Sequence, residues 1–277
     1  MRIVSLACSN TEIIAALGCS HLLVGVDDHS DHPHDVVNRL PRLGPDLQID
    51  LEAVEALAPD LVLASLTVPG HETVVEGLEY RGIPCLTPEA DSLEDVYRNI
   101  REVAHALAPA DPDVVSRGTE LIREMRQRFQ NPWGSSTDSH RARSHAPPRV
   151  LVQWWPKPVI APGKRSWTHD VVGAAGGVNA SGGHDVKSRP FTWPEVVELA
   201  PDAIVISWCG VDPQRYRPDV VLSNPELQGV PAVQSGRVFS IPEAYLGRPG
   251  PRLVEGLAAL RSVVDRCTHP PSPPSLT

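Results

Sequence analysis

The chain has no long apolar run, no excess of basic charge and no paired cysteine motif, and each absence excludes a class of protein. No apolar stretch among its 277 residues approaches the roughly 18 residues that a helix needs to span a bilayer. The formal net charge is −9, whereas binding to a nucleic-acid backbone needs a basic face. The five cysteines show no CxxC spacing, so we expect buried thiols rather than a disulfide framework.

Catalytic motifs are absent as well. The sequence contains no GxSxG, HExxH or GxxxxGK[ST] motif, and no GxGxxG motif after a strand. Ser166, His169 and Asp170 are residue types of a catalytic triad, but residues so close on one loop rarely reach the geometry that activates a nucleophile. We therefore predict that the protein is not an enzyme and uses no catalytic cofactor.

A repeated phrase is the most informative feature that the sequence does contain. Residues 51–64 read LEAVEALAPDLVLA, and residues 193–206 read WPEVVELAPDAIVI. Each reads as a short amphipathic helix, a Pro-Asp stop and a buried strand, which is an αβ unit of a parallel sheet. The two prolines, Pro59 and Pro201, lie 142 positions apart, about half the chain. We predict an α/β fold of two similar lobes with mainly parallel central sheets and a ligand cleft between the lobes.

The segment between the repeats supplies the connection. Residues 92–107 and 114–129 both carry apolar residues at helical spacing, and we expect a single long helix among them to join the lobes. Residues 130–148 are polar and flanked by proline, which is typical of a surface loop. The predicted parts are an N-terminal lobe over 1–107, a connecting helix and loop over 108–148, a C-terminal lobe over 149–267 and a disordered tail over 268–277.

Several of these phrases together resemble a known family. They are RIVSLACSNTEIIAALG followed by GVDDHSDHP, the first repeat, SRPFTWPEVVELAPDAIVI, and GRVFSIPEAYLGRPGPRLVEGLAAL. They are similar to the substrate-binding proteins of ABC importers for cobalamin, haem and ferric siderophores, with the cobalamin-binding branch nearest. The resemblance implies cobalamin or another corrinoid as transported ligand, held between two lobes that one long helix joins, and no catalysis. It also implies an ABC permease as partner, and we expect a monomer.

The resemblance assigns two acidic residues to the permease. Family members carry one exposed acid on each lobe that meets arginines of the permease. Glu52 falls on the matching position of the first lobe. In the second lobe Glu195 is nearest, one residue out of register, because Pro194 stands where the repeat places the acid. Without the family, both would read as ordinary solvated glutamates of a helix.

The ligand pocket is predicted from aromatic residues and from the loop over residues 27–35. A corrin is wide, flat and mostly apolar with a fringe of amides, so it calls for large flat side chains and a few polar groups. In the second lobe the candidates are Trp167, Trp193 and Tyr245, and Arg248 matches a family pocket position. In the first lobe, His29 and His32 stand where the family often has an aromatic residue, and either could stack, hydrogen-bond or coordinate a metal. The competing interpretation is a partly buried tryptophan core and a polar turn.

Other ligands and another compartment stay open. Basic residues such as Lys164, Arg165 and Lys187 suit a haem or ferric-siderophore carrier. A direct zinc or manganese carrier would use His29, His32, His34 and His71, but their spacing is no metal motif and we assign no metal site. MRIVSL enters a strand without the features of a leader peptide, which fits either an extracytoplasmic mature domain or a cytoplasmic corrinoid-handling protein.

Overall fold

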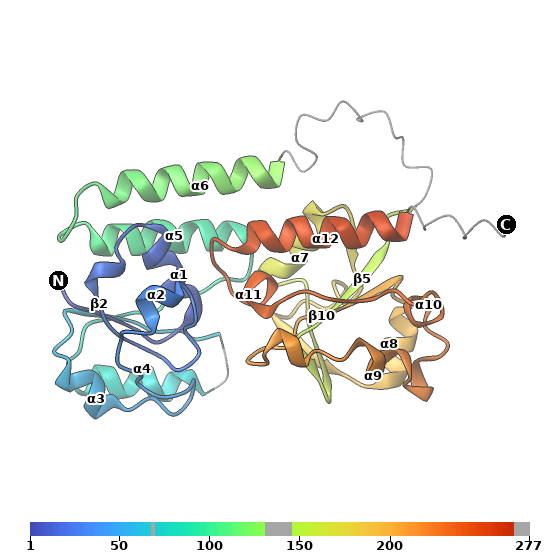
Figure 1. The fold of residues 1–277 in the computed structure, drawn as a ribbon, viewed down its shortest axis with the longest axis horizontal. Helices are drawn as coiled ribbons and strands as arrows, with labels where there is room; N and C mark the ends of the chain where they lie inside the picture. The colour runs from blue at the N-terminus through green and yellow to red at the C-terminus, as the bar shows by residue number, and fades with distance from the viewer. Residues whose placement is uncertain (68–69, 131–145, 269–277) are drawn as a thin grey trace. The chain divides into compact units, whose positions relative to one another are not determined.

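A computed structural model of the chain describes residues 1–67, 70–130 and 146–268. The chain divides into two compact units (Figure 1). The first unit comprises residues 1–90, 94–126 and 248–251, and the second comprises the described residues of 91–93, 127–247 and 252–277. Within the described part of the chain, no helix has both the length and the apolar character needed to cross a membrane.

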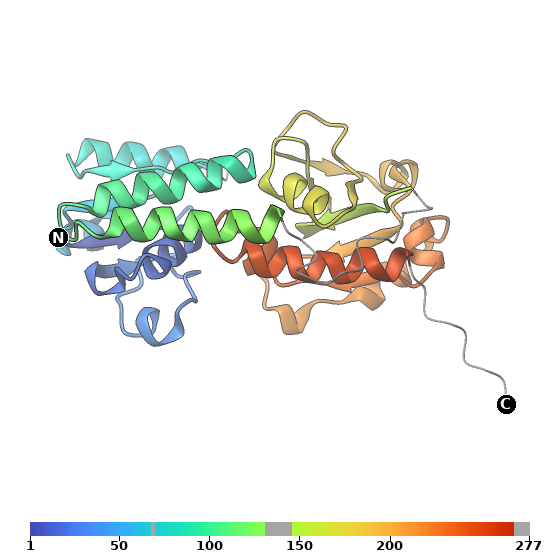
Figure 2. The same cartoon turned by 90° about the horizontal axis from the view of Figure 1, so that it is seen from above.

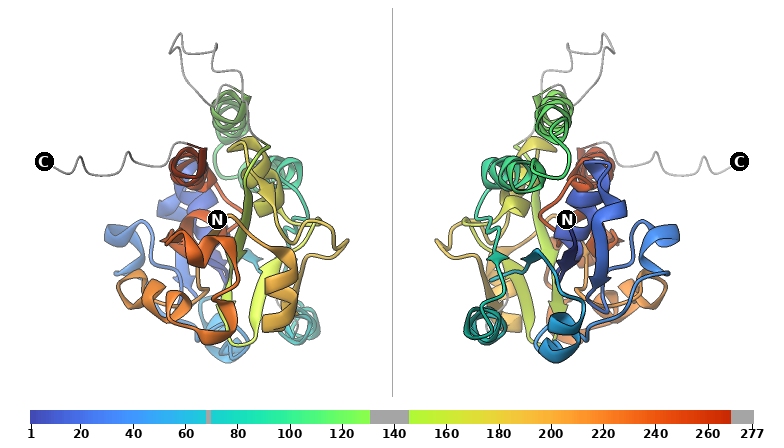
Figure 3. Two further views of the ribbon diagram at one scale, coloured as in Figure 1. Left: turned by 90° about the vertical axis from the view of Figure 1, so that its right-hand side faces the viewer. Right: turned by 90° about the vertical axis from the view of Figure 1, so that its left-hand side faces the viewer.

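The first unit is built on a four-stranded parallel sheet (Figure 3, right). Its strands, in spatial order, are β2 (Leu23–Val26), β1 (Ile3–Ser5), β3 (Leu61–Leu63) and β4 (Cys85–Leu86). The strands are almost entirely apolar because both faces are covered, and Val4 and Val62 are fully buried. The smaller helices of this unit are α1 (Cys8–Ala16), α2 (His34–Val37), α3 (Leu51–Ala56) and α4 (His71–Tyr80).

Two long antiparallel helices, α5 (Leu93–Leu107) and α6 (Val114–Gln130), run side by side (Figures 1 and 2). The helical spacing predicted from the sequence is confirmed in α5, because Val96, Ile100 and Val103 are all fully buried. Gly118 of α6 allows the close approach, since a Cβ atom there would lie 2.9 Å from the Cβ of Ala104.

The second unit contains a second parallel sheet and a small antiparallel one (Figure 3, left). The parallel strands, in spatial order, are β8 (Val178–Asn179), β5 (Arg149–Gln153), β10 (Ala203–Ile206) and β11 (Val238–Ser240). The antiparallel strands are β6 (Trp155–Pro156), β7 (Val159–Pro162) and β9 (Ser188–Phe191). The helices of at least four residues are α7 (Trp167–Ala174), α8 (Trp193–Leu199), α9 (Pro218–Leu222), α10 (Pro231–Gln234), α11 (Glu243–Leu246) and α12 (Leu253–Thr268).

The repeat seen in the sequence extends to individual hydrogen bonds. The backbone N–H of Arg2 donates to Asp60 Oδ2 at 2.6 Å, and the backbone N–H of Arg149 donates to Asp202 Oδ2 at 2.8 Å. Each arginine also donates from Nε to the carbonyl at the end of the repeated helix, at 2.9 Å in the first unit and 3.0 Å in the second. Each Pro-Asp stop therefore ties the start of one strand to the start of its neighbour.

The predicted α/β class, with two lobes built on mainly parallel sheets, is confirmed by this architecture. The small antiparallel sheet was not predicted. The domain boundaries stay predictions. The predicted loop over 130–148 and the predicted tail over 268–277 lie almost entirely outside the described residues.

Candidate ligand-binding site

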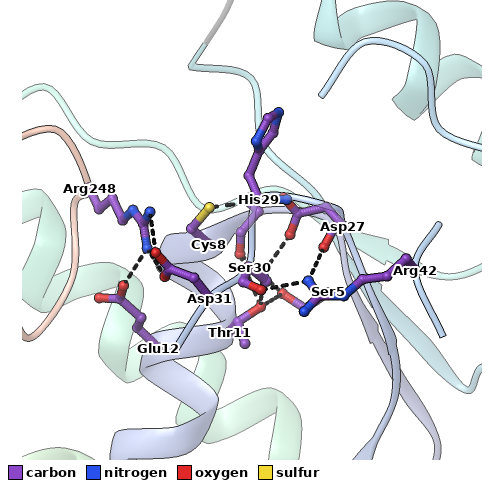
Figure 4. Close-up of polar contacts among 11 residues, drawn as sticks. Ser5, Cys8, Thr11, Glu12, Asp27, His29, Ser30, Asp31, Arg42 and Arg248 are labelled. Carbon is purple, nitrogen blue, oxygen red and sulfur yellow. Dashed lines mark hydrogen bonds and ion pairs between the residues drawn. The ribbon is translucent and has the colours of Figure 1, made fainter. Parts of the chain in front are cut away.

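The first candidate surface lies at the carboxyl edge of the first unit's sheet, where β1 and β2 end. In parallel α/β sheets this edge carries the ligand-facing loops. The loop that follows β2 begins with Asp27, which is only 3% exposed. Its carboxylate accepts hydrogen bonds from the Ser30 hydroxyl at 2.5 Å and from the backbone N–H of His29 at 3.0 Å (Figure 4). Burial raises the pKa of the Asp27 carboxyl above its ordinary value.

Buried hydroxyl groups fix this loop to the sheet and to α1. The Thr11 hydroxyl lies 2.8 Å from the Ser5 hydroxyl and 2.7 Å from that of Ser30, and all three residues are buried. From the other side, Arg42 Nη1 donates to the carbonyl oxygens of Asp27 at 3.0 Å and Ser30 at 2.6 Å. The loop is thus held by side-chain hydrogen bonds where no strand pairing is available.

The two histidines predicted to meet the ligand are exposed members of this region. The ring of His29 points away from the hydrogen-bonded cluster (Figure 4), while its backbone is held by Asp27. His32 is exposed and precedes a cis peptide bond to Pro33. Cys8, at the start of α1, places its Sγ atom 3.9 Å from Asp27 Oδ2. This edge therefore carries the exposed imidazole of His29 beside a set of buried, hydrogen-bonded polar groups.

Arg248 belongs to the first unit, although the residues on either side of segment 248–251 belong to the second. Its Nη1 atom donates to Glu12 Oε1 at 2.9 Å and to Asp31 Oδ1 at 2.6 Å, and Nη2 donates to Asp31 Oδ2 at 3.2 Å (Figure 4). The Glu12 side chain is 2% exposed, that of Arg248 is 10% exposed and that of Asp31 is 52% exposed. The structure thus brings Arg248 together with the histidine-bearing loop and gives it two carboxylate partners.

Trp167 lies in the interior of the second unit, where 6% of its surface is exposed. Its indole Nε1 donates to the Leu246 carbonyl at 2.8 Å, and the Thr168 hydroxyl donates to the same oxygen at 2.9 Å. The ring stacks on Trp154 with centroids 5.7 Å apart. These contacts make Trp167 a support of the helix α11.

The other predicted aromatic residues are half-buried. Trp193 begins α8 and packs against the core of the second unit. Tyr245 lies in α11, with the guanidinium of Arg252 4.9 Å from the centre of its ring. Tyr245 and Trp167 are linked through α11, because Trp167 donates to the carbonyl of Leu246, the residue that follows Tyr245 in that helix.

Trp155 is the aromatic residue that the sequence reasoning did not select. Strand β5 ends at Gln153, and Trp155 follows two positions later, after Trp154. Trp155 is 41% exposed, more than any other tryptophan among the described residues. It therefore stands at the carboxyl edge of the second parallel sheet, in β6, with part of its side chain exposed to solvent. The signal was the doublet Trp154-Trp155, because adjacent residues of an extended segment point to opposite faces.

The two predicted permease contacts differ in the interactions that their carboxylates make within the protein. Glu52 is exposed in the first turn of α3, whose N-cap is the Asp50 side chain. Glu195 accepts hydrogen bonds from the Thr192 backbone at 2.7 Å and the Thr192 hydroxyl at 2.9 Å, and it forms an ion pair with Arg189. The backbone hydrogen bond from Thr192, together with Arg189 and the Thr192 hydroxyl, lowers the pKa of Glu195 to about 2.

The histidines considered for direct metal binding do not converge. His71 is buried and its Nε2 lies 2.6 Å from Asp46 Oδ1, whereas His29, His32 and His34 are exposed. Across residues 1–67, 70–130 and 146–268, no three His, Cys, Asp or Glu side chains gather in a way that could hold a metal ion.

With this geometry described, the comparison with known proteins decides the family. The pattern that defines the periplasmic binding proteins matches residues 3–245. The chain belongs to the periplasmic binding protein family. It is a binding protein and not an enzyme, as predicted, and it is of the kind that serves ABC importers of vitamin B12, haem or siderophores.

Individual relatives cover nearly the whole chain. A vitamin B12-binding protein of Pectobacterium atrosepticum is 27% identical over 256 residues, which are 91% of this chain and 84% of that protein. An uncharacterised ABC transporter substrate-binding lipoprotein of Bacillus subtilis is 26% identical over 262 residues, 94% of this chain and 78% of that protein. The solved structure of the periplasmic haem-binding protein RhuT of Roseiflexus, in its apo form, superposes with a TM-score of 0.79 at 27% identity, covering 97% of this chain and 99% of that one.

Proposed function

We propose that the protein is the substrate-binding component of an ABC importer that captures cobalamin or a related corrinoid and delivers it to its permease. The relatives named as vitamin B12-binding proteins support this ligand. The names of relatives also include periplasmic proteins and a lipoprotein, which supports a place outside the cytoplasm.

The observation that favours a corrinoid is that three basic side chains considered as ligand contacts are already paired with carboxylates of the protein. In the first unit Arg248 is held by Glu12 and Asp31. In the second unit Arg165 Nε donates to Asp91 at 2.9 Å and Lys187 Nζ lies 3.1 Å from the same carboxylate. An anionic ligand needs cations that its own charge can neutralise. Haem carries two propionates, whereas the fringe of cobalamin is made of uncharged amides, which need hydrogen bonds and no counter-charge.

Each unit supplies contacts of the expected type. In the first unit, His29 and His32 offer ring nitrogens and flat faces to the macrocycle and its amides. Among the described residues of the second unit, Trp155 is the most exposed tryptophan, and Trp193 and Tyr245 offer the parts of their rings that the core leaves uncovered. Trp167 supports α11, the helix that carries Tyr245.

Calorimetric titration of the purified protein with cyanocobalamin, with haemin and zinc run beside it, tests the proposal. A one-to-one isotherm with a Kd of about 1 μM or tighter, equivalent to roughly −8 kcal/mol, is the expected result. Absence of heat with cyanocobalamin, together with saturation by haemin or zinc, would show that the ligand is wrong.

Haem is the second candidate, and one feature of this chain favours it. The ring of His29 is exposed at the sheet edge and can coordinate iron through a nitrogen (Figure 4). The haem-binding proteins among the solved structures support this reading. If haemin is the ligand, its visible spectrum should shift on binding, and His29→Ala should abolish that shift.

A further inference from the structure

The ion pairs of Arg248 are unequal in a way that bears on ligand choice. Glu12 is almost completely buried and holds the guanidinium from the protein side. Asp31 is half-exposed and meets both terminal nitrogens, Nη1 at 2.6 Å and Nη2 at 3.2 Å. This two-point contact is the geometry with which an arginine binds the carboxylate of a ligand. Asp31 therefore occupies the solvent side of Arg248 in the way that a bound carboxylate would (Figure 4).

We propose that Asp31 is a specificity-determining residue that excludes ligands carrying a carboxylate where they approach Arg248. The inference rests on the proposed function, since it concerns which macrocycle this site accepts. Asp31 acts as a built-in competitor: a propionate or another acid can reach the guanidinium only by displacing it.

Displacement is costly because Asp31 cannot move far away. The preceding residue, Ser30, is held through its hydroxyl by Asp27 and Thr11 and through its carbonyl by Arg42. A displaced Asp31 carboxylate therefore stays near the incoming acid, and like charges at short range repel.

The charge balance adds to this effect. Glu12 and Asp31 already place two carboxylates on one guanidinium. A ligand acid would be the third, whereas an amide adds no charge and meets no such repulsion. Selection of this kind works by disfavouring the wrong ligand and leaves affinity for the right one unchanged.

The test uses two macrocycle pairs whose members differ in the number of free carboxylates. Cyanocobalamin is compared with its monocarboxylic acids, in which one side-chain amide is hydrolysed, and haemin dimethyl ester is compared with haemin. The proteins are the wild type, Asp31→Asn and Asp35→Asn. Asp35 is an exposed aspartate of the same region, so its variant makes the same change in net charge away from Arg248. Asp31→Asn also removes the two-point ion pair with Arg248, so its melting temperature should fall slightly, and all affinities are compared at a temperature at which the three proteins are folded.

The expected result is a change in the ratio of affinities. Wild type and Asp35→Asn should bind cyanocobalamin about tenfold more tightly than its acids, a difference of ~1.4 kcal/mol. Asp31→Asn should lower this ratio to about threefold or less, because the acids gain more affinity than cyanocobalamin does. A ratio that Asp31→Asn leaves unchanged, or one that Asp35→Asn lowers equally, would overturn the inference.

The haemin pair separates this inference from the proposed function. If cyanocobalamin does not bind, the proposed ligand is wrong, and the inference is then decided on haemin alone. A gain in haemin affinity in Asp31→Asn, absent with the dimethyl ester and absent in Asp35→Asn, supports the role of Asp31. The lack of any gain for the free acid in that variant refutes it.

Discussion

Two tryptophans of the second unit have different roles: one is buried and stabilises the fold, and the other is partly exposed and available to a ligand. Trp167 is buried and its indole N–H donates to the Leu246 carbonyl, whereas 41% of the surface of Trp155 is exposed. A buried indole stabilises the fold, and an exposed one at a ligand-facing edge can change its partner from water to ligand. Exposure therefore separates two residues that the sequence shows as equals.

Replacing Trp155 by alanine should weaken cyanocobalamin binding by more than tenfold, or ~1.4 kcal/mol, and destabilise the fold less than Trp167→Ala does, because Trp155 is 41% exposed. Trp167→Ala should instead lower the free energy of unfolding by about 3–5 kcal/mol, because it removes a buried ring. Titration calorimetry and urea unfolding measure the two effects. Tyr80→Ala, at a tyrosine that is 91% exposed, is the control and should change neither. A stable Trp167→Ala with lost affinity, beside an unaffected Trp155→Ala, would reverse the two roles.

Glu52 and Glu195 should also behave differently. Glu52→Ala should leave the affinity for cyanocobalamin within about twofold and reduce uptake in a transport assay, since the side chain is exposed on α3. Glu195→Ala should lower the melting temperature, because it removes the carboxylate half of the capping box of α8, which accepts from the Thr192 backbone, and the ion pair with Arg189. Glu124→Ala on α6 is the control for a lost surface carboxylate. Weaker ligand binding by Glu52→Ala would contradict its assignment to the permease.

Asp27 should make stability depend on pH. Its pKa is raised above 3.8 in the folded protein, chiefly by burial, so the folded state keeps a proton that the unfolded state has lost. The contribution of this group is complete below 3.8 and declines as the pH rises through the raised pKa. Asp27→Asn should remove that decline, so the difference in free energy of unfolding between variant and wild type should change with pH, whatever the loss of one acceptor oxygen costs at every pH. Urea unfolding from about pH 4 to about pH 7 measures it, and a difference that does not vary with pH would refute it.

At the scale of elements, the repeated helices α3 and α8 end alike. The alanine that precedes each proline adopts a left-handed backbone, with φ 44° at Ala58 and φ 42° at Ala200. An alanine in this region is strained by contact of its Cβ atom with the backbone, and glycine is not. Both helices therefore stop at a strained residue one position before the proline that blocks continuation.

Substituting glycine at these stops should stabilise the protein. Ala58→Gly and Ala200→Gly should each raise the free energy of unfolding by about 0.5–1 kcal/mol, because release of left-handed strain outweighs the added freedom of the unfolded chain. Ala53→Gly, inside α3, should lower it by about 1 kcal/mol, because glycine is a poor helix former. Urea unfolding of the three variants gives the comparison. If Ala58→Gly destabilised the protein as much as Ala53→Gly does, the left-handed conformation of Ala58 would carry no measurable energetic cost.

Elements could be predicted where the signal is local. The repeated helix-stop-strand phrase lies within fourteen residues each time, and its periodicity and Pro-Asp stop are sufficient to define an αβ unit. The antiparallel strands β6, β7 and β9 escaped prediction because they are two to four residues long. The pair of Glu12 with Arg248 could not be read from the sequence either, since it joins residues 236 positions apart.

At the scale of the whole molecule, the two parallel sheets have the same strand order. The order β2-β1-β3-β4 in the first unit corresponds to β8-β5-β10-β11 in the second. The same Arg-Asp hydrogen bonds recur at the same place in both. One pattern of packing therefore supports two loop sets with different chemistry: polar side chains and histidines in the first unit, and indoles in the second.

The position of segment 248–251 has a consequence for how the protein is made. The carboxylate of Glu12 leaves the ribosome 236 residues before its partner Arg248. Until then the nascent first unit carries a buried acid without its counter-ion, a costly arrangement. The first unit should therefore remain incompletely folded during synthesis until Arg248 has emerged.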